Sequence, residues 1–194
     1  LKVSPDRFSR CGEKSNFWSM GDTGPCGPCT EIFYDHGPAI AGGPPGSPDE
    51  EGDRYVEIWN LVFTEYNQDV DKKLTPLPQK NIDTGMGLER LAMVVQKQPH
   101  IFATDLYTPI MKEVGELPGF GDSGEDVVND RRRRIVADHI RAACFLIADG
   151  VRFSNKDQGY ILRRIVRRAA DQFLISEFSF DRLVNSVIVN YDHQ

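Results

Sequence analysis

A short segment near the middle of the chain sets an acid, two glycines and an arginine close together. Asp83 ends a predicted strand, Gly85 and Gly87 follow it, and Arg90 falls in the first turn of a helix predicted over residues 88–96. Glycines let a ligand approach the backbone closely, and a helix N-terminus attracts anions. Because Arg90 has the wrong charge for that helix end, the pattern favours an anionic ligand such as a polyphosphate. A tight turn with a surface arginine would explain it equally well.

The pair Cys26 and Cys29 has the spacing seen in zinc and redox sites. A zinc site needs two more ligands, and the remaining cysteines and histidines form no second pair at ligand spacing. A redox pair belongs at a helix N-terminus after a strand, whereas here a strand is predicted to follow. We therefore expect structural or incidental thiols in a reducing compartment, with a zinc module as the weaker alternative.

Other polar and aromatic groups could line a pocket. Trp18 precedes the Gly- and Pro-rich segment 21–29 and could wall a small cavity. Glu57 and Asn60 interrupt a mostly apolar predicted strand, so they need partners if they are buried. His139 lies on the apolar stripe of a predicted helix, where we expect a hydrogen-bonded core histidine. No Ser/His/Asp or Cys/His spacing predicts a nucleophilic enzyme.

The elements that must position these groups alternate in type along the chain. Strands are predicted over residues 30–35, 55–66 and up to Asp83, and helices over residues 88–96, 105–116, 130–150, 159–173 and 179–189. Residues 21–29 are too rich in Gly and Pro for a helix, residues 36–53 form a loop, and the prolines at 76 and 78 mark an extended approach. A Gly- and acid-rich linker over residues 117–130 is the expected domain boundary.

Charge is segregated along the 194 residues, although the net charge is only −6. Residues 131–168 carry +8, the first 130 residues −11 and the tail from residue 171 −3. The basic block has the size of a nucleic-acid footprint, and a solvated helical face is the plainer alternative. With 40 % hydrophobic residues the composition is that of a soluble globular protein, and no run of about 18 apolar residues predicts a membrane span.

Several motifs together resemble the alanyl-tRNA synthetase family of class II aminoacyl-tRNA synthetases. The likeness spans about residues 16–170 and rests on the motifs Asn16-Phe17-Trp18, Gly21-Asp22-Thr23-Gly24-Pro25-Cys26-Gly27-Pro28-Cys29-Thr30-Glu31-Ile32, Glu57-Ile58-Trp59-Asn60, Asp83-Thr84-Gly85-Met86-Gly87-Leu88-Glu89-Arg90, Ile135-Val136-Ala137-Asp138-His139-Ile140-Arg141 and Gly159-Tyr160-Ile161-Leu162-Arg163-Arg164-Ile165.

The resemblance implies an α+β fold. Residues 1–120 would be the C-terminal part of an antiparallel-sheet class II catalytic domain, and residues 121–194 the start of an all-α tRNA-recognition domain. The catalytic core would be incomplete, because the family's motifs 1 and 2 lie upstream of anything in this sequence. The implied activity is ATP-dependent attachment of alanine to tRNA(Ala) through an alanyl-adenylate. Such chemistry depends on positioning and cationic clamps more than on a nucleophile.

The resemblance also implies a role for each matching residue. Arg90 and Asp83 would be the catalytic residues, Arg90 holding the ATP phosphates and Asp83 the ammonium group of alanine. The implied binding residues are Arg90, Gly87 and Gly85 for ATP; Trp18, Asn60, Val62, Asp83 and Gly85 for alanine; and Asn155, Arg163, Arg164, Arg167 and Arg168 for the tRNA acceptor stem.

The implied cofactors are ATP and Mg²⁺, with Glu57 as a possible Mg²⁺ ligand and zinc only in an editing domain that this sequence lacks. The implied partners are L-alanine, tRNA(Ala) and the remaining domains of a longer cytoplasmic enzyme. We therefore expect the 194-residue chain by itself to be inactive or very weakly active. A non-catalytic RNA- or partner-binding fragment that keeps the synthetase fold is the alternative.

Overall fold

The computed structural model describes residues 3–120, 127–173 and 178–192. Contacts divide the chain into two compact units, Leu1–Pro99 and His100–Gln194. The first contains η1 (Pro5–Arg7), α1 (Glu13–Asn16), β1 (Phe17–Ser19), β2 (Gly24–Asp35), β3 (Tyr55–Gln68), β4 (Leu74–Met86) and α2 (Leu88–Val95). The second contains η2 (Ile101–Ala103), α3 (Thr108–Gly115), α4 (Val127–Ala148), α5 (Asp157–Ala170) and α6 (Asp181–Tyr191). The predicted α+β class is confirmed.

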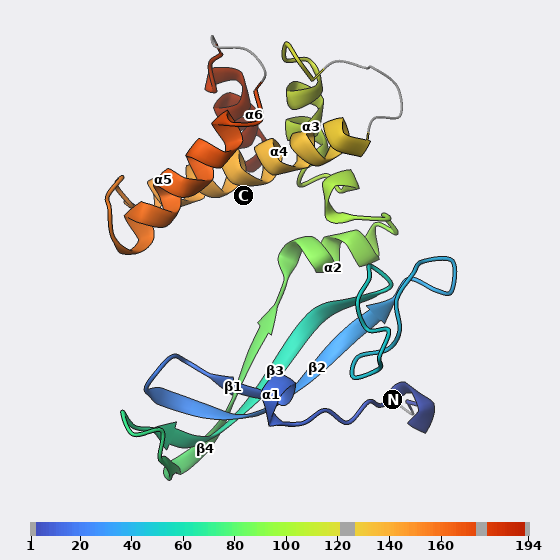
Figure 1. Ribbon diagram of the computed structural model, residues 1–194, viewed down its shortest axis with the longest axis vertical. Helices are drawn as coiled ribbons and strands as arrows, with labels where there is room; N and C mark the ends of the chain where they lie inside the picture. The colour runs from blue at the N-terminus through green and yellow to red at the C-terminus, as the bar shows by residue number, and fades with distance from the viewer. Residues whose placement is uncertain (1–2, 121–126, 174–177, 193–194) are drawn as a thin grey trace. The chain divides into compact units, whose positions relative to one another are not determined.

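The first unit is built on one antiparallel sheet in the order β1-β2-β3-β4 (Figure 1). Successive side chains of each strand point to opposite faces of this sheet. The side chains of Cys26, Cys29 and Val62 are buried, and so is Met93 on α2. The backbone N–H of Gly87 donates to the carbonyl of Ile58, which ties the start of α2 to β3.

Two strand boundaries differ from the sequence prediction. β2 begins at Gly24 rather than at residue 30, because the Gly- and Pro-rich segment pairs with both β1 and β3. β4 begins at Leu74 and includes Pro76 and Pro78. It is an edge strand, the place in a sheet where proline is tolerated.

The glycine turn that we predict after Asp83 also differs in the structure. β4 continues through Gly85 to Met86, and only Gly87 separates the strand from α2. Neither Gly85 nor Gly87 has a positive φ. Gly85 therefore matters for the space it leaves, since a Cβ atom there would meet nothing within 4 Å.

The second unit is a cluster of helices in which α4 contacts α3, α5 and α6. Its core contains Tyr107, Ile110, Phe120, Leu162 and Leu183, all nearly inaccessible to solvent. The helices predicted from periodicity are all present, with ends that differ by up to three residues. Among the described residues, no helix is both long and apolar enough to cross a membrane.

The predicted linker over residues 117–130 includes residues 121–126, which lie outside the described residues. The boundary between the compact units falls after Pro99 in the sequence, and α3 packs against α4 and α6 in the second unit. A compact structural unit need not coincide with a functional domain. The functional boundary predicted after residue 120 therefore stays a prediction.

Gly27 on β2 lies where a side chain would collide with the backbone of β3. A Cβ atom at Gly27 would lie 1.8 Å from the backbone oxygen of Phe63. Gly27→Ala should therefore push the two strands apart and lower the free energy of unfolding of the first unit by about 1–3 kcal/mol. Urea denaturation followed by tryptophan fluorescence measures this unit, since Trp18 and Trp59 both belong to it. Gly12→Ala, with open space around its Cβ, is the control; equal midpoints for the two variants would contradict the expectation.

Candidate active site and candidate RNA-binding helix

The register of β2, β3 and β4 gathers the predicted amino-acid site on one face of the sheet. Asn60 lies opposite Gly85, and Val62 lies opposite Asp83. On the other side of β3, Asn60 lies opposite Glu31 and Val62 opposite Cys29. Directly paired residues of adjacent strands share a face. We call these six residues, Cys29, Glu31, Asn60, Val62, Asp83 and Gly85, the polar face.

Some residues of the polar face are buried, and others are exposed to solvent. Val62 and Cys29 are buried, whereas Asp83 and Gly85 are exposed on the edge strand. The Asn60 Nδ2 donates to Glu31 Oε1 at 3.3 Å. Burial, and then the charge of Glu57, raise the pKa of Glu31. The arrangement offers an exposed carboxylate, an apolar wall and unoccupied space at a glycine within one patch.

Arg90 lies in the first turn of α2 and reaches back to β3. Its Nη1 donates to the backbone oxygen of Glu57 at 2.8 Å and lies 3.4 Å from the Glu57 carboxylate. The side chain is half exposed. Among the described residues its Nε and Nη2 have no hydrogen-bond partner, so the guanidinium keeps donors for an anion.

The predicted Mg²⁺ ligand Glu57 is therefore already partnered by Arg90. The described residues bring no group of three or more His, Cys, Asp or Glu together at metal-binding geometry. Mg²⁺ commonly takes one or two carboxylates together with substrate phosphates, which one carboxylate such as Glu57 can satisfy in part. The role of Glu57 stays a prediction.

Trp18 lies on β1, opposite Gly27 of β2, with 37 % of its surface exposed. Sheet order separates it from Val62 by one intervening strand. The register that unites Asn60, Val62, Asp83 and Gly85 does not extend to Trp18. Its role as a pocket wall stays a prediction.

The two thiols of the Cys-x2-Cys segment are buried in the sheet. Cys26 Sγ lies 3.6 Å from the backbone oxygen of Tyr66, and Cys29 Sγ lies 3.8 Å from Asn16 Oδ1. Both cysteines are free. Burial raises the pKa of each thiol, with the nearby charge of Glu31 adding to the rise at Cys29. The structural interpretation of this pair agrees with these contacts.

The structure confirms only in part the prediction that His139 is a hydrogen-bonded core residue. The ring is largely enclosed, and its Nδ1 lies 3.0 Å from Asp138 Oδ2. Its Nε2 is buried and has no partner among the described residues. The hydrogen bonding of the ring is thus satisfied at one nitrogen only.

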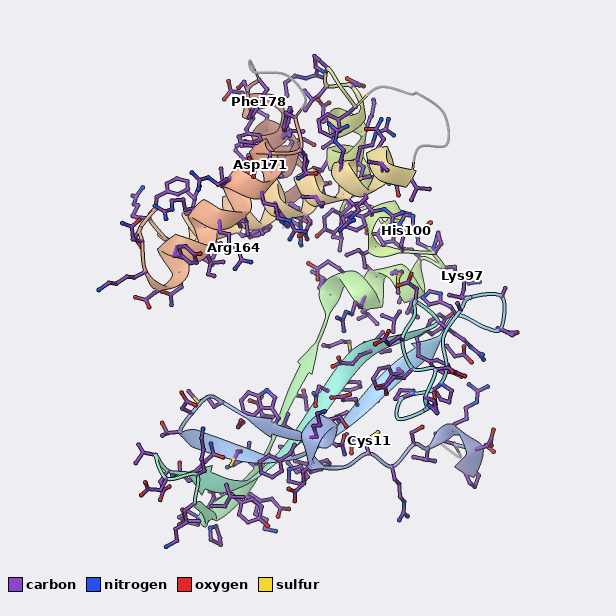
Figure 2. All side chains as sticks on the ribbon, in the orientation of Figure 1. Cys11, Lys97, His100, Arg164, Asp171 and Phe178 are labelled. Carbon is purple, nitrogen blue, oxygen red and sulfur yellow. The ribbon has the colours of Figure 1, made fainter. Side chains whose placement is uncertain are left out.

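The basic block divides into two groups of arginines with different surroundings. On α5 the four arginines predicted to contact RNA, Arg163, Arg164, Arg167 and Arg168, are exposed; Arg164 is labelled on this helix in Figure 2. Among the described residues no carboxylate forms an ion pair with any of them. Arg163 donates to Asn155 Oδ1 and lies over the ring of Tyr160. Asn155 and the helix thus form one polar surface.

Three arginines of α4, Arg132, Arg133 and Arg141, instead donate hydrogen bonds within the helical unit. Arg132 donates to the backbone oxygens of Gln172 and Gly119 and lies 4.6 Å from the centre of the Phe120 ring. Arg133 donates to the backbone oxygen of Phe120. Arg141 bonds the hydroxyl groups of Tyr107 and Tyr191. These three side chains are therefore engaged within the helical unit. Whether residues 131–168 act as a nucleic-acid footprint stays a prediction.

Sequence reasoning gave no role to Glu31, although it belongs to the polar face. The available signal was its spacing from Cys29 on a predicted strand, which puts both on one side. Its partner could not be found without the register that sets it opposite Asn60.

Comparison with known proteins shows the family to which the chain belongs. A family model described as tRNA synthetases class II (A) matches residues 1–192, so the chain belongs to the class II tRNA synthetases. Its curated relatives are alanine–tRNA ligases. Those of Legionella pneumophila (strain Corby) and Acidithiobacillus ferridurans are 60 % identical over 170 and 169 residues, each covering 87 % of this chain and 19 % of the relative. That of Halorhodospira halophila is 56 % identical over 191 residues, or 95 % of this chain and 21 % of the relative. The chain thus spans about a fifth of the length of these relatives.

The burial of the thiols has a chemical consequence. Because the pKa values of Cys26, Cys29 and Cys144 are raised by burial, little thiolate forms at pH 8 and alkylation should be slow. Iodoacetamide labelling followed by peptide mass spectrometry should find Cys11, which is partly exposed, modified first. Mild urea should bring the rates of all four together. Faster labelling of Cys26 or Cys29 than of Cys11 in the folded chain would contradict this expectation.

Proposed function

We propose that this chain is part of an enzyme that attaches alanine to tRNA(Ala) at the expense of ATP. The observation that carries the proposal is the β3–β4 register, which unites Asn60, Val62, Asp83 and Gly85 on one face. Arg90 lies at the end of the same strand pair, on α2. The alanine–tRNA ligases to which the chain is similar supply the identity of the amino acid.

The chain's own residues suit the amino-acid end of this reaction. The exposed carboxylate of Asp83 would bind the ammonium group in a charge-assisted contact. The buried side chain of Val62 would close the floor, and Gly85 would leave room for a methyl group. A pocket of this kind excludes amino acids with larger side chains well, and those with side chains of nearly the same shape poorly.

The guanidinium group of Arg90 is suited to binding the phosphate groups of ATP. In the proposed first step, an alanine carboxylate oxygen bonds to the α-phosphorus of ATP and pyrophosphate leaves. In the second, a hydroxyl of the terminal ribose of tRNA attacks the carbonyl carbon, loses its proton, and AMP leaves. Arg90 would hold the negative phosphate oxygens, for which Mg²⁺ bound near Glu57 would supply further positive charge. Both steps depend on orientation of the reactants and on electrostatic stabilisation, and neither needs a protein nucleophile.

A longer protein would supply what this chain lacks. Ile82, Ile32 and Met86 lie on the sheet face opposite the polar face, and Ile82 has 63 % of its surface exposed. Exposed apolar residues grouped on a sheet face favour coverage by further segments. We place the working enzyme in the cytoplasm, in keeping with its four free cysteines.

The second candidate is a fragment that binds RNA without catalysis. The exposed arginines of α5 favour it, because RNA contact by that helix requires nothing from the polar face. The two candidates differ in whether the polar face is needed for adenylate formation.

Asp83 and Arg90 separate these candidates. In the full-length protein, Asp83→Asn should raise the KM for alanine by about tenfold or more, because it removes a charge-assisted contact to a cation. Arg90→Ala should lower ATP–pyrophosphate exchange by about 100-fold, as expected for loss of a phosphate clamp. Asp71→Asn, in the exposed β3–β4 hairpin, controls for surface charge. Exchange that is unchanged in both site variants would eliminate the catalytic candidate.

The division of the basic block predicts different effects for two arginines. Arg164→Ala should weaken binding of tRNA(Ala) to this chain and reduce the slope of log K against log salt by about one, with an unchanged melting temperature. Arg132→Ala should instead lower the melting temperature, because it removes hydrogen bonds to two backbone carbonyls and the contact with the Phe120 ring. Arg131→Ala, exposed on α4, is the matched control. Salt-independent binding of tRNA by the parent chain would exclude a phosphate footprint.

A further inference from the structure

Glu31 is a carboxylate on the polar face whose two neighbours both present hydrogens to it. The Asn60 Nδ2 donates to its Oε1 at 3.3 Å, and the Cys29 thiol sulfur lies 4.0 Å from the same oxygen. Asn60 is directly opposite Glu31 in the β2–β3 register. The contact is therefore fixed by backbone pairing as well as by side-chain geometry.

This contact decides which way the Asn60 amide points. An ionised carboxylate can only accept hydrogen bonds, whereas an asparagine amide has a donating end and an accepting end. Asn60 must therefore turn its NH2 group to Glu31 and its Oδ1 away from it. Oδ1 is buried and has no hydrogen-bond partner among the described residues. A buried acceptor in that state is costly unless a donor is supplied to it.

The amino-acid ligand of the proposed function carries a suitable donor. Gly85 lies opposite Asn60 on β4, and Asp83 lies two residues before it on the same strand and face. An ammonium group bound by the exposed Asp83 has three N–H donors, so it can also donate to a second acceptor on this face. The carboxylate end of the amino acid has no donor to offer Oδ1.

We propose that Glu31 is a positioning residue that holds the Asn60 amide with Oδ1 facing the bound amino acid, so that Asn60 accepts from the ammonium group and does not donate to the carboxylate. The inference rests on the proposed function and adds a residue and an orientation to it. Glu31 itself acts only through Asn60. Asn60 and Asp83 together would select a ligand with a cationic amine.

The test uses the full-length enzyme and ATP–pyrophosphate exchange with alanine and ATP varied separately. Glu31→Gln should raise the KM for alanine about tenfold, because a glutamine can offer its own NH2 and let the Asn60 amide turn round. The KM for ATP should change by less than about twofold. A merely structural role would affect both values and the melting temperature together. Glu65→Gln, on β3 and paired with Lys80, is the matched control and should leave both KM values unchanged.

A double-mutant cycle shows whether Glu31 acts through Asn60. In an Asn60→Ala background, Glu31→Gln should have no further effect on the KM for alanine, since nothing remains to be oriented. The same tenfold effect in both backgrounds would overturn the proposal. So would a KM for alanine within twofold of the parent value in Glu31→Gln when Asp83→Asn is strongly impaired. If Asp83→Asn is also unaffected, the proposed function itself fails.

Ligand analogues test the orientation when Glu31→Gln does not fold. Alaninol keeps the ammonium group of alanine and lacks its carboxylate, whereas lactate keeps the carboxylate and lacks the ammonium group. Asn60→Ala should weaken competitive inhibition by alaninol about tenfold and leave inhibition by lactate within twofold. The opposite pattern would show that Asn60 donates to the carboxylate and would overturn the inference.

Discussion

The antiparallel pairing of β3 with β4 determines where four residues of the candidate amino-acid site lie: Asn60, Val62, Asp83 and Gly85. Because side chains alternate along a strand, the pairs Asn60–Gly85 and Val62–Asp83 must share a face. A shift of one residue would move Asp83 to the opposite side, among Ile82's apolar neighbours. The same register ends β4 at Met86, so that Gly87 and α2 follow at once and Arg90 reaches Glu57. A few backbone hydrogen bonds therefore position both ends of the proposed reaction.

In the helical unit, arginine serves two physical purposes that composition cannot distinguish. Arg132 and Arg133 supply donors to backbone carbonyls at Phe120, Gly119 and Gln172, where chain segments end without helical partners. The α5 arginines repel one another at i,i+4 spacing, and among the described residues no carboxylate relieves that repulsion. Like charges without a carboxylate partner on one exposed helix favour a polyanionic partner, whereas Arg132 and Arg133 are hydrogen-bonded to the protein itself.

Several local features could be predicted because they depend on near neighbours in sequence. The helices at α2, α4 and α5 follow from apolar periodicity, and the buried strand β3 follows from its run of apolar and aromatic residues. The extent of β2 and β4 could not be predicted, because Gly- and Pro-rich segments become strands only when another strand pairs with them. Gly27 is compatible with either a loop or a strand, and its contact with the Phe63 carbonyl decides between them. The burial of Cys26 and Cys29 could not be predicted either, because it depends on the pairing of β2 with its neighbours.

The sequence by itself determined the family, the α+β order and the residue types of the site, because these depend on motifs and on local periodicity. Only the tertiary structure decided which of those residues share a face, and which charges are available to a ligand. Asn60 illustrates the difference. Its side chain can donate or accept, and the sequence does not specify which end is used. The carboxylate of Glu31, placed opposite by strand pairing 29 residues away in the chain, settles the orientation because it can accept a hydrogen bond but cannot donate one.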